Sequence, residues 1–588
     1  MADEPAPTPP HGAELRGMDL VTQSPTTEGR FGFMFKNQPP LPASDPLLTS
    51  LGQAMEEKPV IGTPLTDPVT GVAVLNPDGS PVMANKDNND SLGENPNPLL
   101  TSGFTFVGQF VDHDITFDTT PLDQQQSDPY ATTNFRTPRY DLDAIYGRGP
   151  SSDPQFYDLA DRDKFLINKT SYPMIRTDKL KTPGTLYDVP RNLSTGKAII
   201  ADPRNDQTEI ILQLHVAMQM FHNKLVDQMR RQLLPRSAVF EAARRMARWH
   251  YQWMVIHEFL PAIVGQAMAD SVYKEVLTGV PIINIKYYKP TNPLGRPFIP
   301  VEFSVAAYRF GHSITRPRYT VQDYVAYKVD PVTGEKVEYT VEVKGVPLFE
   351  AAANDNNLNG ARPLLPRLRL QWSKFFNDPL APKNPDGTVP RTARPVRQFD
   401  GTLATPLFML PAQALPDSNI DENLLAVRNL HRGKKMGLPS GQQVARLMGV
   451  TPLTNAQLWQ SHRIEVKIPI PTTEPTPFTP PAVANVVQVI REFDVENQDL
   501  KQVLADPGWN GEAPLWFYIL KEAEIVGKGR TLGPVGGRIV AEVLVGLLQK
   551  DLNSYLYLNA AWKPAPPIAR VYGQFGMADL LKFTGVWS

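Results

Sequence analysis

The segment Gly108–Asp114, with the sequence GQFVDHD, places an amide, two carboxylates and an imidazole inside a largely apolar stretch. If this segment is helical, Gln109, Asp112 and His113 stand at positions i, i+3 and i+4 and share one face. Polar groups on an apolar helix are costly unless partners satisfy them. The pattern therefore predicts a buried reactive pocket, and Asp114, which points elsewhere, needs a partner of its own.

The composition narrows the possible chemistry. The chain has 588 residues and a formal net charge of −2, so no general attraction to nucleic acid or anionic membranes is expected. Cysteine is absent, which excludes disulfides, thiolate nucleophiles, Cys–zinc sites and thiolate-ligated haem. No apolar run reaches about 18 residues, so no membrane-spanning helix is expected. The acidic, Pro-rich start has no signal peptide, which predicts a cytoplasmic protein or secretion by a route that the sequence does not show.

Proline marks the loops of the chain. The 59 prolines are about twice the usual share. They cluster in four segments: residues 1–65, 290–300, 379–395 and 468–481. Proline ends helices and cannot donate to a β-ladder, so these clusters predict loops or wrapping segments. None resembles a flexible linker between domains. We expect one large domain over residues 46–588, after an extended Pro-rich arm over residues 1–45.

Most of the periodic segments have helical spacing. Five are recognisable: residues 207–234, 238–260, 422–433, 440–448 and 536–555. The first is apolar around nearly its whole circumference, which is typical of a central helix, and Pro261 is expected to end the second. Strand-like alternation is clearest at residues 337–346 and 465–470. The predicted fold is mainly α, a single large helical domain with few short strands and Pro-rich wrapping loops.

The nine histidines are the candidate haem or soft-metal ligands, since cysteine is absent. His215 and His222 lie seven residues apart on the predicted central helix, where packing within the core is the favoured interpretation. His257 lacks the second histidine of an HExxH zinc site. His312 follows Gly311, and a glycine there lets a flat ligand or another backbone approach closely. Without further context, His312 is still better explained as a core histidine.

The segment TPRYDLD, residues 137–143, has the spacing of a cation-binding loop. Thr137, Asp141 and Asp143 alternate along it and would face a common centre, with a backbone carbonyl between them. Hard cations such as Ca²⁺ prefer this set of oxygens. A turn with two solvated aspartates explains the pattern equally well unless a further carboxylate lies nearby, and Asp114 would be that carboxylate.

In order and spacing these pieces resemble the animal-type haem peroxidases of the peroxidase–cyclooxygenase superfamily, in a bacterial-looking version. The resemblance covers about residues 100–450 and continues more weakly to about residue 575. The segment GQFVDHD is similar to the family's distal helix. The resemblance implies that His113 is the distal histidine, Gln109 the distal glutamine, and Asp112 a carboxylate that can form an ester with a haem methyl.

The remaining motifs extend the resemblance to the cation loop and to both sides of the haem. It implies calcium ligands at five positions: Asp114, Thr137, the Arg139 carbonyl, Asp141 and Asp143. Arg204, before the predicted central helix, matches the distal arginine. His312, in the sequence RFGH, matches the proximal iron ligand, and Asn429 matches the residue that accepts the other N–H of that imidazole.

Two departures limit what the resemblance implies. Gln207 stands where the family has its second ester-forming carboxylate, and Thr208 where some members have a methionine–haem link. At most one covalent haem bond, through Asp112, is therefore predicted. Arg309 occupies the position of the tyrosine that the oxygenase branches use, and Tyr308 lies one residue away, which argues against an oxygenase reaction.

The implied function is a haem peroxidase with haem b and calcium, linked to the response to oxidative stress. It would reduce hydrogen peroxide to water through an oxoferryl intermediate and oxidise small phenolic, aromatic amine or halide donors. His113 would move a proton between the peroxide oxygens, Arg204 would stabilise the departing hydroxide, and Gln109 would orient peroxide or water. Three alternatives remain: a fatty-acid oxygenase on the same scaffold, a non-haem metal hydrolase built on residues 112–114, and a non-catalytic haem-binding protein.

Overall fold

The computed structural model describes most of the chain. The described residues are 31–57, 96–117, 134–171, 185–276, 279–290, 295–329, 336–350, 356–384, 387–408, 424–467 and 488–587. Residues 1–30 of the expected N-terminal arm lie outside them. Residues 31–35 pack on the body of the protein, because the N–H groups of Met34 and Phe35 each donate to the Glu302 carboxylate at 2.9 Å.

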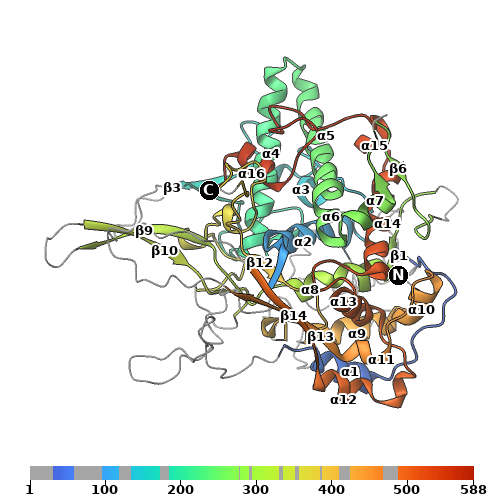
Figure 1. Cartoon of the computed structure of the whole chain (residues 1–588). Helices are drawn as coiled ribbons and strands as arrows, with labels where there is room; N and C mark the ends of the chain where they lie inside the picture. Colours follow the sequence, from blue (N-terminus) through green and yellow to red (C-terminus); the bar gives the residue numbers. More distant parts are fainter. Residues whose placement is uncertain are drawn as a thin grey trace, which may run out of the picture.

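Helices dominate the described part of the chain, which confirms the mainly α prediction (Figure 1). The longer helices are α1 Asp45–Ala54, α2 Gly103–Ile115, α4 Glu209–Arg231, α5 Arg236–Met254, α9 Leu425–Lys435, α13 Leu515–Ile525 and α14 Pro534–Lys550. The shorter ones are α3 Asp143–Tyr146, α6 Leu260–Val264, α7 Gln266–Val272, α8 Gly311–Ile314, α10 Gly441–Leu447, α11 Asn455–Trp459, α12 Gln498–Leu504, α15 Tyr555–Leu558 and α16 Met577–Thr584.

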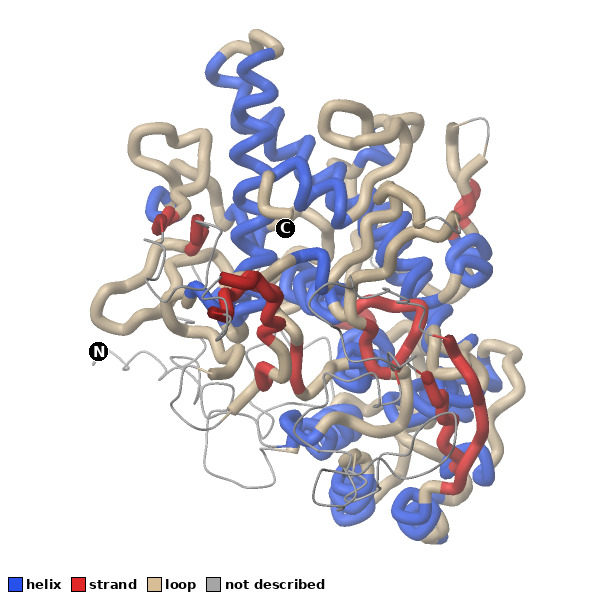
Figure 2. Tube along the Cα trace, turned by 60° about the vertical axis from the view of Figure 1, so that its left-hand side comes forward, coloured by secondary structure: helices blue, strands red, loops and turns tan. Residues whose placement is uncertain are grey.

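The strands form two-stranded sheets at the edges of the helical body (Figure 2). Only the first of the following pairs is parallel. The pairs are β1 Phe31–Gly32 with β7 Ile299–Pro300, β2 Pro96–Thr101 with β12 Pro395–Arg397, β3 Asn168–Ser171 with β4 Thr185–Asp188, β5 Tyr273–Lys274 with β6 Ile282–Ile283, β8 Arg318–Tyr319 with β11 Val346–Pro347, β9 Gln322–Val329 with β10 Lys336–Val343, and β13 Gln460–Lys467 with β14 Gln488–Glu496. The predicted strands at residues 337–346 and 465–470 correspond to β10 and β13.

The predicted central helix is α4. Its first turn is capped by Thr208, whose hydroxyl accepts the Ile211 N–H at 3.3 Å, and its side chains are buried along most of its length. The main cluster of buried apolar side chains runs from Phe31 to Leu581. Helices α4 and α5 form a hairpin that projects from the body, at the top of Figure 1.

Two predicted helix ends differ in the structure. Pro261 does not end the second helix: one wide, π-helical turn, Val255–Phe259, leads into α6, where Pro261 lies in the first turn and its missing N–H costs no hydrogen bond. The last predicted helix ends at Lys550 rather than near residue 554, because the Asp551 carboxylate turns the chain by accepting the Asn553 N–H at 2.9 Å.

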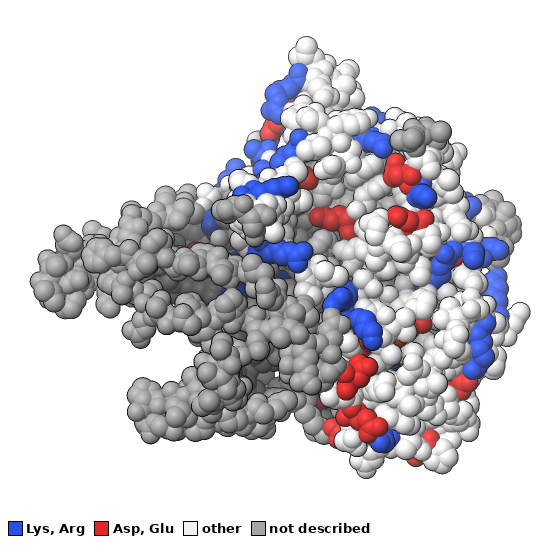
Figure 3. Space-filling view, viewed as in Figure 1, with Lys and Arg blue, Asp and Glu red and all other residues white. Residues whose placement is uncertain are grey.

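Charged side chains of both signs are interspersed over the described part of the face in Figure 3, and several basic ones follow the α4–α5 hairpin. Among the described helices, none has both the length and the apolar character that crossing a membrane requires.

Candidate functional site

The side chain of His113 lies at the centre of a buried hydrogen-bond chain. Its Nδ1 is 2.8 Å from Asn205 Oδ1, and Asn205 Nδ2 is 3.0 Å from His215 Nδ1. An amide oxygen can only accept, so His113 Nδ1 donates and its Nε2 keeps a lone pair. Burial, and then the charge of Arg204, lower the pKa of His113 to about 4. His113 is therefore a neutral imidazole near neutral pH, with Nε2 available as a base.

Arg204 is fixed beside the carboxyl end of α2. It lies in the short 3-10 helix η5, Pro203–Asp206, where Asp202 binds its guanidinium through two bonds, Nε–Oδ1 at 3.0 Å and Nη2–Oδ2 at 2.7 Å. Arg204 Nη2 also donates to the His113 carbonyl at 2.8 Å. The guanidinium carbon is 4.3 Å from the ring centre of Phe117. These contacts bring Arg204 and His113 together, as the sequence predicts.

The other polar residues of α2 face different partners. Gln109 Nε2 is 3.4 Å from Gln207 Oε1, a long contact between two partly exposed amides. Asp112 accepts a hydrogen bond from the Thr116 hydroxyl at 2.9 Å through Oδ1. Among the described residues, the group of possible metal ligands that includes Asp114 contains neither Asp112 nor His113. The described residues therefore do not form the metal site on residues 112–114 that a non-haem hydrolase would need.

His312 is the second residue of the short helix α8, which follows the 3-10 helix η8, Ala307–Phe310. Its Nδ1 is 2.8 Å from Asn429 Nδ2, so these residues meet as predicted. The expected direction of the bond is wrong, because Asn429 presents its NH2 group to the ring rather than its oxygen. Arg309, which has donors only, binds Asn429 Oδ1 through Nη1 at 3.1 Å and so turns the amide.

Polar and small residues of α2 and α8 stay partly exposed where the two helices meet. The two helices pack against each other, yet Gln109 and Asp112 on α2, and Gly311 and His312 on α8, all remain partly exposed. A side chain at Gly311 would meet no atom within 4 Å of its Cβ. A ligand bound between the two helices would cover these partly exposed groups. The residues present therefore fit a haem ligated by His312.

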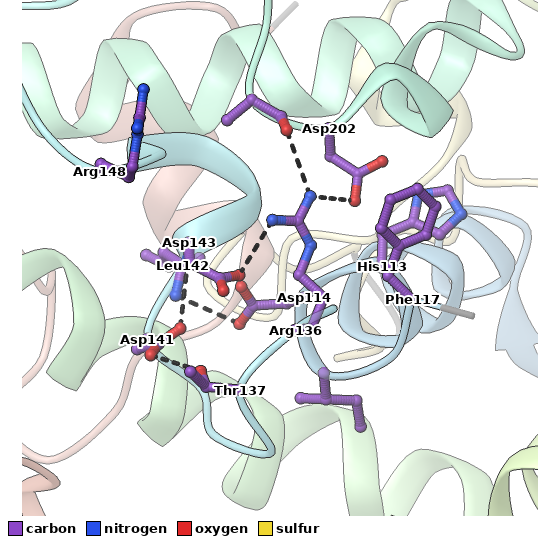
Figure 4. Close-up of polar contacts among 12 residues, drawn as sticks. His113, Asp114, Phe117, Arg136, Thr137, Asp141, Leu142, Asp143, Arg148 and Asp202 are labelled. Atoms are coloured by element: carbon purple, nitrogen blue, oxygen red, sulfur yellow. Dashed lines mark hydrogen bonds and ion pairs between the residues drawn. The ribbon is translucent and has the colours of Figure 1, made fainter. Parts of the chain in front are cut away.

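The predicted cation ligands also meet. Single carboxylate oxygens of Asp114, Asp141 and Asp143 lie within 4.8 Å of one another. The Thr137 hydroxyl donates to Asp141 Oδ2 at 2.6 Å, and Arg139, in the same loop, donates its N–H to the Thr137 carbonyl at 2.8 Å. Figure 4 shows the three carboxylates converging where α2 meets this loop.

The chemistry of this cluster fits a hard cation. Asp114 Oδ1 and both carboxylate oxygens of Asp143 are buried and have no hydrogen-bond donor among the described residues. Burial, and then the charges of Asp143 and Asp141, hold the pKa of Asp114 well above its usual value. Burial also raises the pKa of Asp143 to about 8. Buried carboxylates that repel one another are stabilised by a divalent cation, which prefers such oxygens.

Sequence reasoning missed three residues of this site. Asn205, which bonds His113, and Asp202, which holds Arg204, both flank Arg204 in the sequence ADPRND. Their position beside a candidate catalytic arginine was the available signal. Arg136, which is 1% exposed and bonds Asp202 Oδ2 at 2.6 Å, lies directly before the cation loop. Nothing in its local sequence distinguishes it from a surface arginine.

Comparison with known proteins agrees with this geometry. The model of the animal haem peroxidase family matches residues 118–351, which contain the cation loop, Arg204 and His312 but neither α2 nor Asn429. The chain is similar to peroxidase A from Dictyostelium discoideum, with a TM-score of 0.50 and 14% identity over 96% of this chain and 92% of that one.

Two further similarities are weaker. A fatty acid alpha-dioxygenase from Oryza sativa gives a TM-score of 0.47 at 11% identity, covering 91% of this chain and 79% of that one. A peroxidase-like protein from Margaritifera margaritifera is 31% identical over 117 residues, which span 20% of this chain and only 14% of that protein.

The mainly helical fold is similar to that of peroxidase A. Within this chain, residues 118–351 carry the match to the animal haem peroxidase domain. The match to this family implies a haem cofactor and an oxidoreductase.

Proposed function

We propose that this chain is a haem peroxidase, which reduces hydrogen peroxide to water and oxidises small phenolic, aromatic amine or halide donors. One observation carries the proposal. A buried, neutral His113 and a fixed Arg204 lie together at the end of α2, and α2 packs against the helix that carries His312. This is an arrangement of a base and a cation suited to cleaving a peroxide bond.

Haem would be held at its iron by His312 and would supply the redox chemistry with peroxide. Ligation through Nε2 requires the proton on Nδ1 of His312. That proton needs an acceptor, so the Asn429 amide would have to turn its oxygen to His312, which the bond from Arg309 opposes because Arg309 has only donors. The bond from Arg309 to Asn429 Oδ1 at 3.1 Å therefore makes Arg309 and Asn429 the residues that control the tautomer of His312.

His113 Nε2 would take a proton from one peroxide oxygen and return it to the other, leaving oxygen. Asn205 keeps the proton of His113 on Nδ1, so Nε2 is ready before peroxide binds. Arg204 stabilises the negative charge that develops on the leaving oxygen. Gln109, which contacts Gln207, orients peroxide or a water molecule.

Asp112 is the residue we assign to a covalent ester with a haem methyl. Hydrogen peroxide would be the two-electron oxidant: a carboxyl oxygen would replace one methyl hydrogen, and the peroxide would leave as two water molecules. Thr116 occupies Oδ1 of Asp112, which leaves Oδ2 for the bond. Gln207 supplies an amide instead of a second carboxylate, so a single ester is expected. Calcium at Asp114, Asp141 and Asp143, with Thr137 and the Arg139 carbonyl, would hold α2 to the loop of residues 137–143.

The test is peroxide-dependent oxidation of a phenolic dye by the haem-loaded protein. His113→Leu should lower kcat/KM for peroxide by about 10²- to 10⁴-fold, the usual contribution of a general base. His431→Leu is the matched control, since His431 contacts Thr49 and Asp45 outside the site. Equal activity of wild-type protein and His113→Leu, or no oxidation by the wild type, would refute the proposal.

A fatty-acid oxygenase is the second candidate function, and the environment of Tyr308 favours it. Its hydroxyl is buried with no hydrogen-bond partner among the described residues, and its ring stacks on Phe303 at 4.6 Å. Such a phenol could be oxidised to a tyrosyl radical. Oxygen uptake with an unsaturated fatty acid, lost in Tyr308→Phe, would support this reaction, whereas no uptake by the wild type excludes it.

A further inference from the structure

The carboxylate of Asp202 is shared by two arginines in the interior of the protein. It is fully buried and accepts Arg204 Nε at 3.0 Å and Nη2 at 2.7 Å. Its Oδ2 also accepts Arg136 Nη2 at 2.6 Å. Burial would raise the pKa of Asp202, but the charges of Arg204 and Arg136 outweigh it and hold that pKa well below its usual value. Asp202 is therefore a permanent anion between two cations.

Arg136 reaches from Asp202 to the cation cluster. Its Nη1 lies 3.7 Å from Asp143 Oδ1, and its Nη2 also donates to the Ala201 carbonyl at 3.3 Å. Figure 4 shows Arg136 between Asp202 on one side and Asp114 and Asp143 on the other. Because the group is 1% exposed, solvent and salt screen these charges only weakly. A change of charge at Asp143 therefore changes the electrostatic interaction between Arg136 and Asp202.

Without a cation, burial and mutual repulsion raise the pKa of Asp114 and of Asp143 and favour their protonated forms, whereas a bound cation favours the ionised forms. When all are ionised, Asp114, Asp141, Asp143 and Asp202 provide four carboxylates, and Arg136 and Arg204 provide two guanidinium groups. A divalent cation at the cluster would neutralise the difference. It would also compete with Arg136 for Asp143, so Arg136 would bind Asp202 more strongly and weaken the hold of Asp202 on Arg204.

We infer that Asp202 is a positioning residue that couples cation binding at Asp114, Asp141 and Asp143 to the guanidinium of Arg204. The inference rests on the proposed function for the role of Arg204, but the coupling itself is a property of the chain. When a cation binds, Asp202 interacts less strongly with Arg204, so the Arg204 guanidinium attracts an anion in the pocket more strongly. By reciprocity, an anion bound beside Arg204 tightens the cation.

The first measurement needs no haem. Calcium affinity of the full chain is measured by competition with a chromophoric chelator, for wild type and Asp202→Asn. Without the carboxylate, Arg136 turns wholly to Asp143 and competes with calcium, so the dissociation constant should rise about tenfold, within the range usual for coupled sites. Asp378→Asn is the matched control, because Asp378 is also buried and bonded by two cations, Arg570 and Lys582. It should change calcium affinity less than about twofold.

The second measurement reports on Arg204 through a spectroscopic signature. Cyanide is titrated into the haem-loaded protein, with and without calcium, and the Soret shift gives its affinity. Calcium should raise cyanide affinity in the wild type, and Asp202→Asn should remove most of that effect. If Asp202→Asn does not fold, Arg136→Lys serves instead, since an ammonium group cannot bridge Asp202 and Asp143 as the guanidinium fork does.

The results separate the inference from the proposed function. Unchanged calcium affinity in the folded variant overturns the coupling even if the protein is an active peroxidase. A calcium effect on cyanide that survives intact in Asp202→Asn also overturns it, because the effect then travels through Asp114 and His113. A tenfold loss of calcium affinity supports the coupling even if the chain shows no peroxidase activity.

Discussion

The hydrogen bond at Nδ1 of His113 determines which nitrogen can accept a proton. Asn205→Ala removes the acceptor at 2.8 Å and leaves His113 free to rotate and to change tautomer. We expect kcat/KM for peroxide to fall by about 10- to 100-fold with haem still bound. Steady-state assays and the Soret spectrum check this. Asn223→Ala, which removes a similar amide from α4 where it bonds the backbone of Phe165, should leave kcat/KM near the wild-type value. An equal loss in both variants would contradict the role of Asn205.

The 3.4 Å contact between Gln109 and Gln207 brings position 207 to the same face as the distal residues. Gln207→Glu should therefore allow a second ester to haem during turnover with peroxide. Acid–acetone extraction followed by mass spectrometry of the protein measures the covalent bonds. Wild-type protein should show at most the Asp112 ester. Identical mass and extraction behaviour in the two proteins would show that residue 207 does not face a haem methyl.

At the level of elements, the cation cluster joins α2 to the loop of residues 137–143. Removing calcium with a chelator should lower the thermal midpoint and increase hydrogen exchange in the carboxyl-terminal turn of α2 and in this loop, because Asp114 and Asp143 are then buried and unneutralised. Exchange in α13 should stay the same. Uniform loosening of both regions, or no change after removal of a measured calcium ion, would contradict this link.

Helices and strands were predictable from the sequence where the pattern of apolar and polar residues within one segment was sufficient. Spacing alone located α4, α9 and α10, and the cluster of polar residues drew attention to the segment that forms α2. Strands β9 and β14 were missed because their pattern is clear only beside their partners β10 and β13. The turn from α5 into α6 through Pro261 was missed because a π-helical turn depends on surrounding packing, which periodicity does not report.

The residues of the candidate site also fall into those that the sequence identifies and those that only the folded structure identifies. His113, Arg204, His312 and the cation loop were identifiable because motif and order place them. Asn205 and Asp202 were not, because an amide or carboxylate next to an arginine has many uses, and only the folded geometry selects one. The orientation of Asn429 also depends on a third residue, Arg309, from another element.

At the scale of the whole molecule, buried ionisable groups of both kinds set the pH dependence of stability. Burial lowers the pKa of His222 from 6.5 to about 4, so its contribution is complete above pH 6.5 and is lost as the pH falls toward 4. Burial raises the pKa of Glu522 from 4.5 to about 7, so its contribution is complete below pH 4.5 and is lost as the pH rises toward 7.

Because His222 and Glu522 change the stability in opposite directions as the pH falls, substitutions at the two residues should have opposite effects. His222→Gln should reduce the loss of unfolding free energy between pH 6.5 and 4.5 by up to roughly 3 kcal/mol, and Glu522→Gln should increase that loss by a similar amount. Urea unfolding at the two pH values measures both effects. Shifts of the same sign in the two variants would contradict the assigned protonation states.

The central claim is that His312 ligates haem between α8 and α2. The most direct measurement is the absorption spectrum of the chain after reconstitution with haem, compared with His312→Ala and with His431→Ala as control. We predict a Soret band of a histidine-ligated ferric haem in the wild type and the control, and its loss or conversion to that of weakly bound haem in His312→Ala. No Soret band in the wild type, or the same spectrum in all three proteins, would contradict the claim.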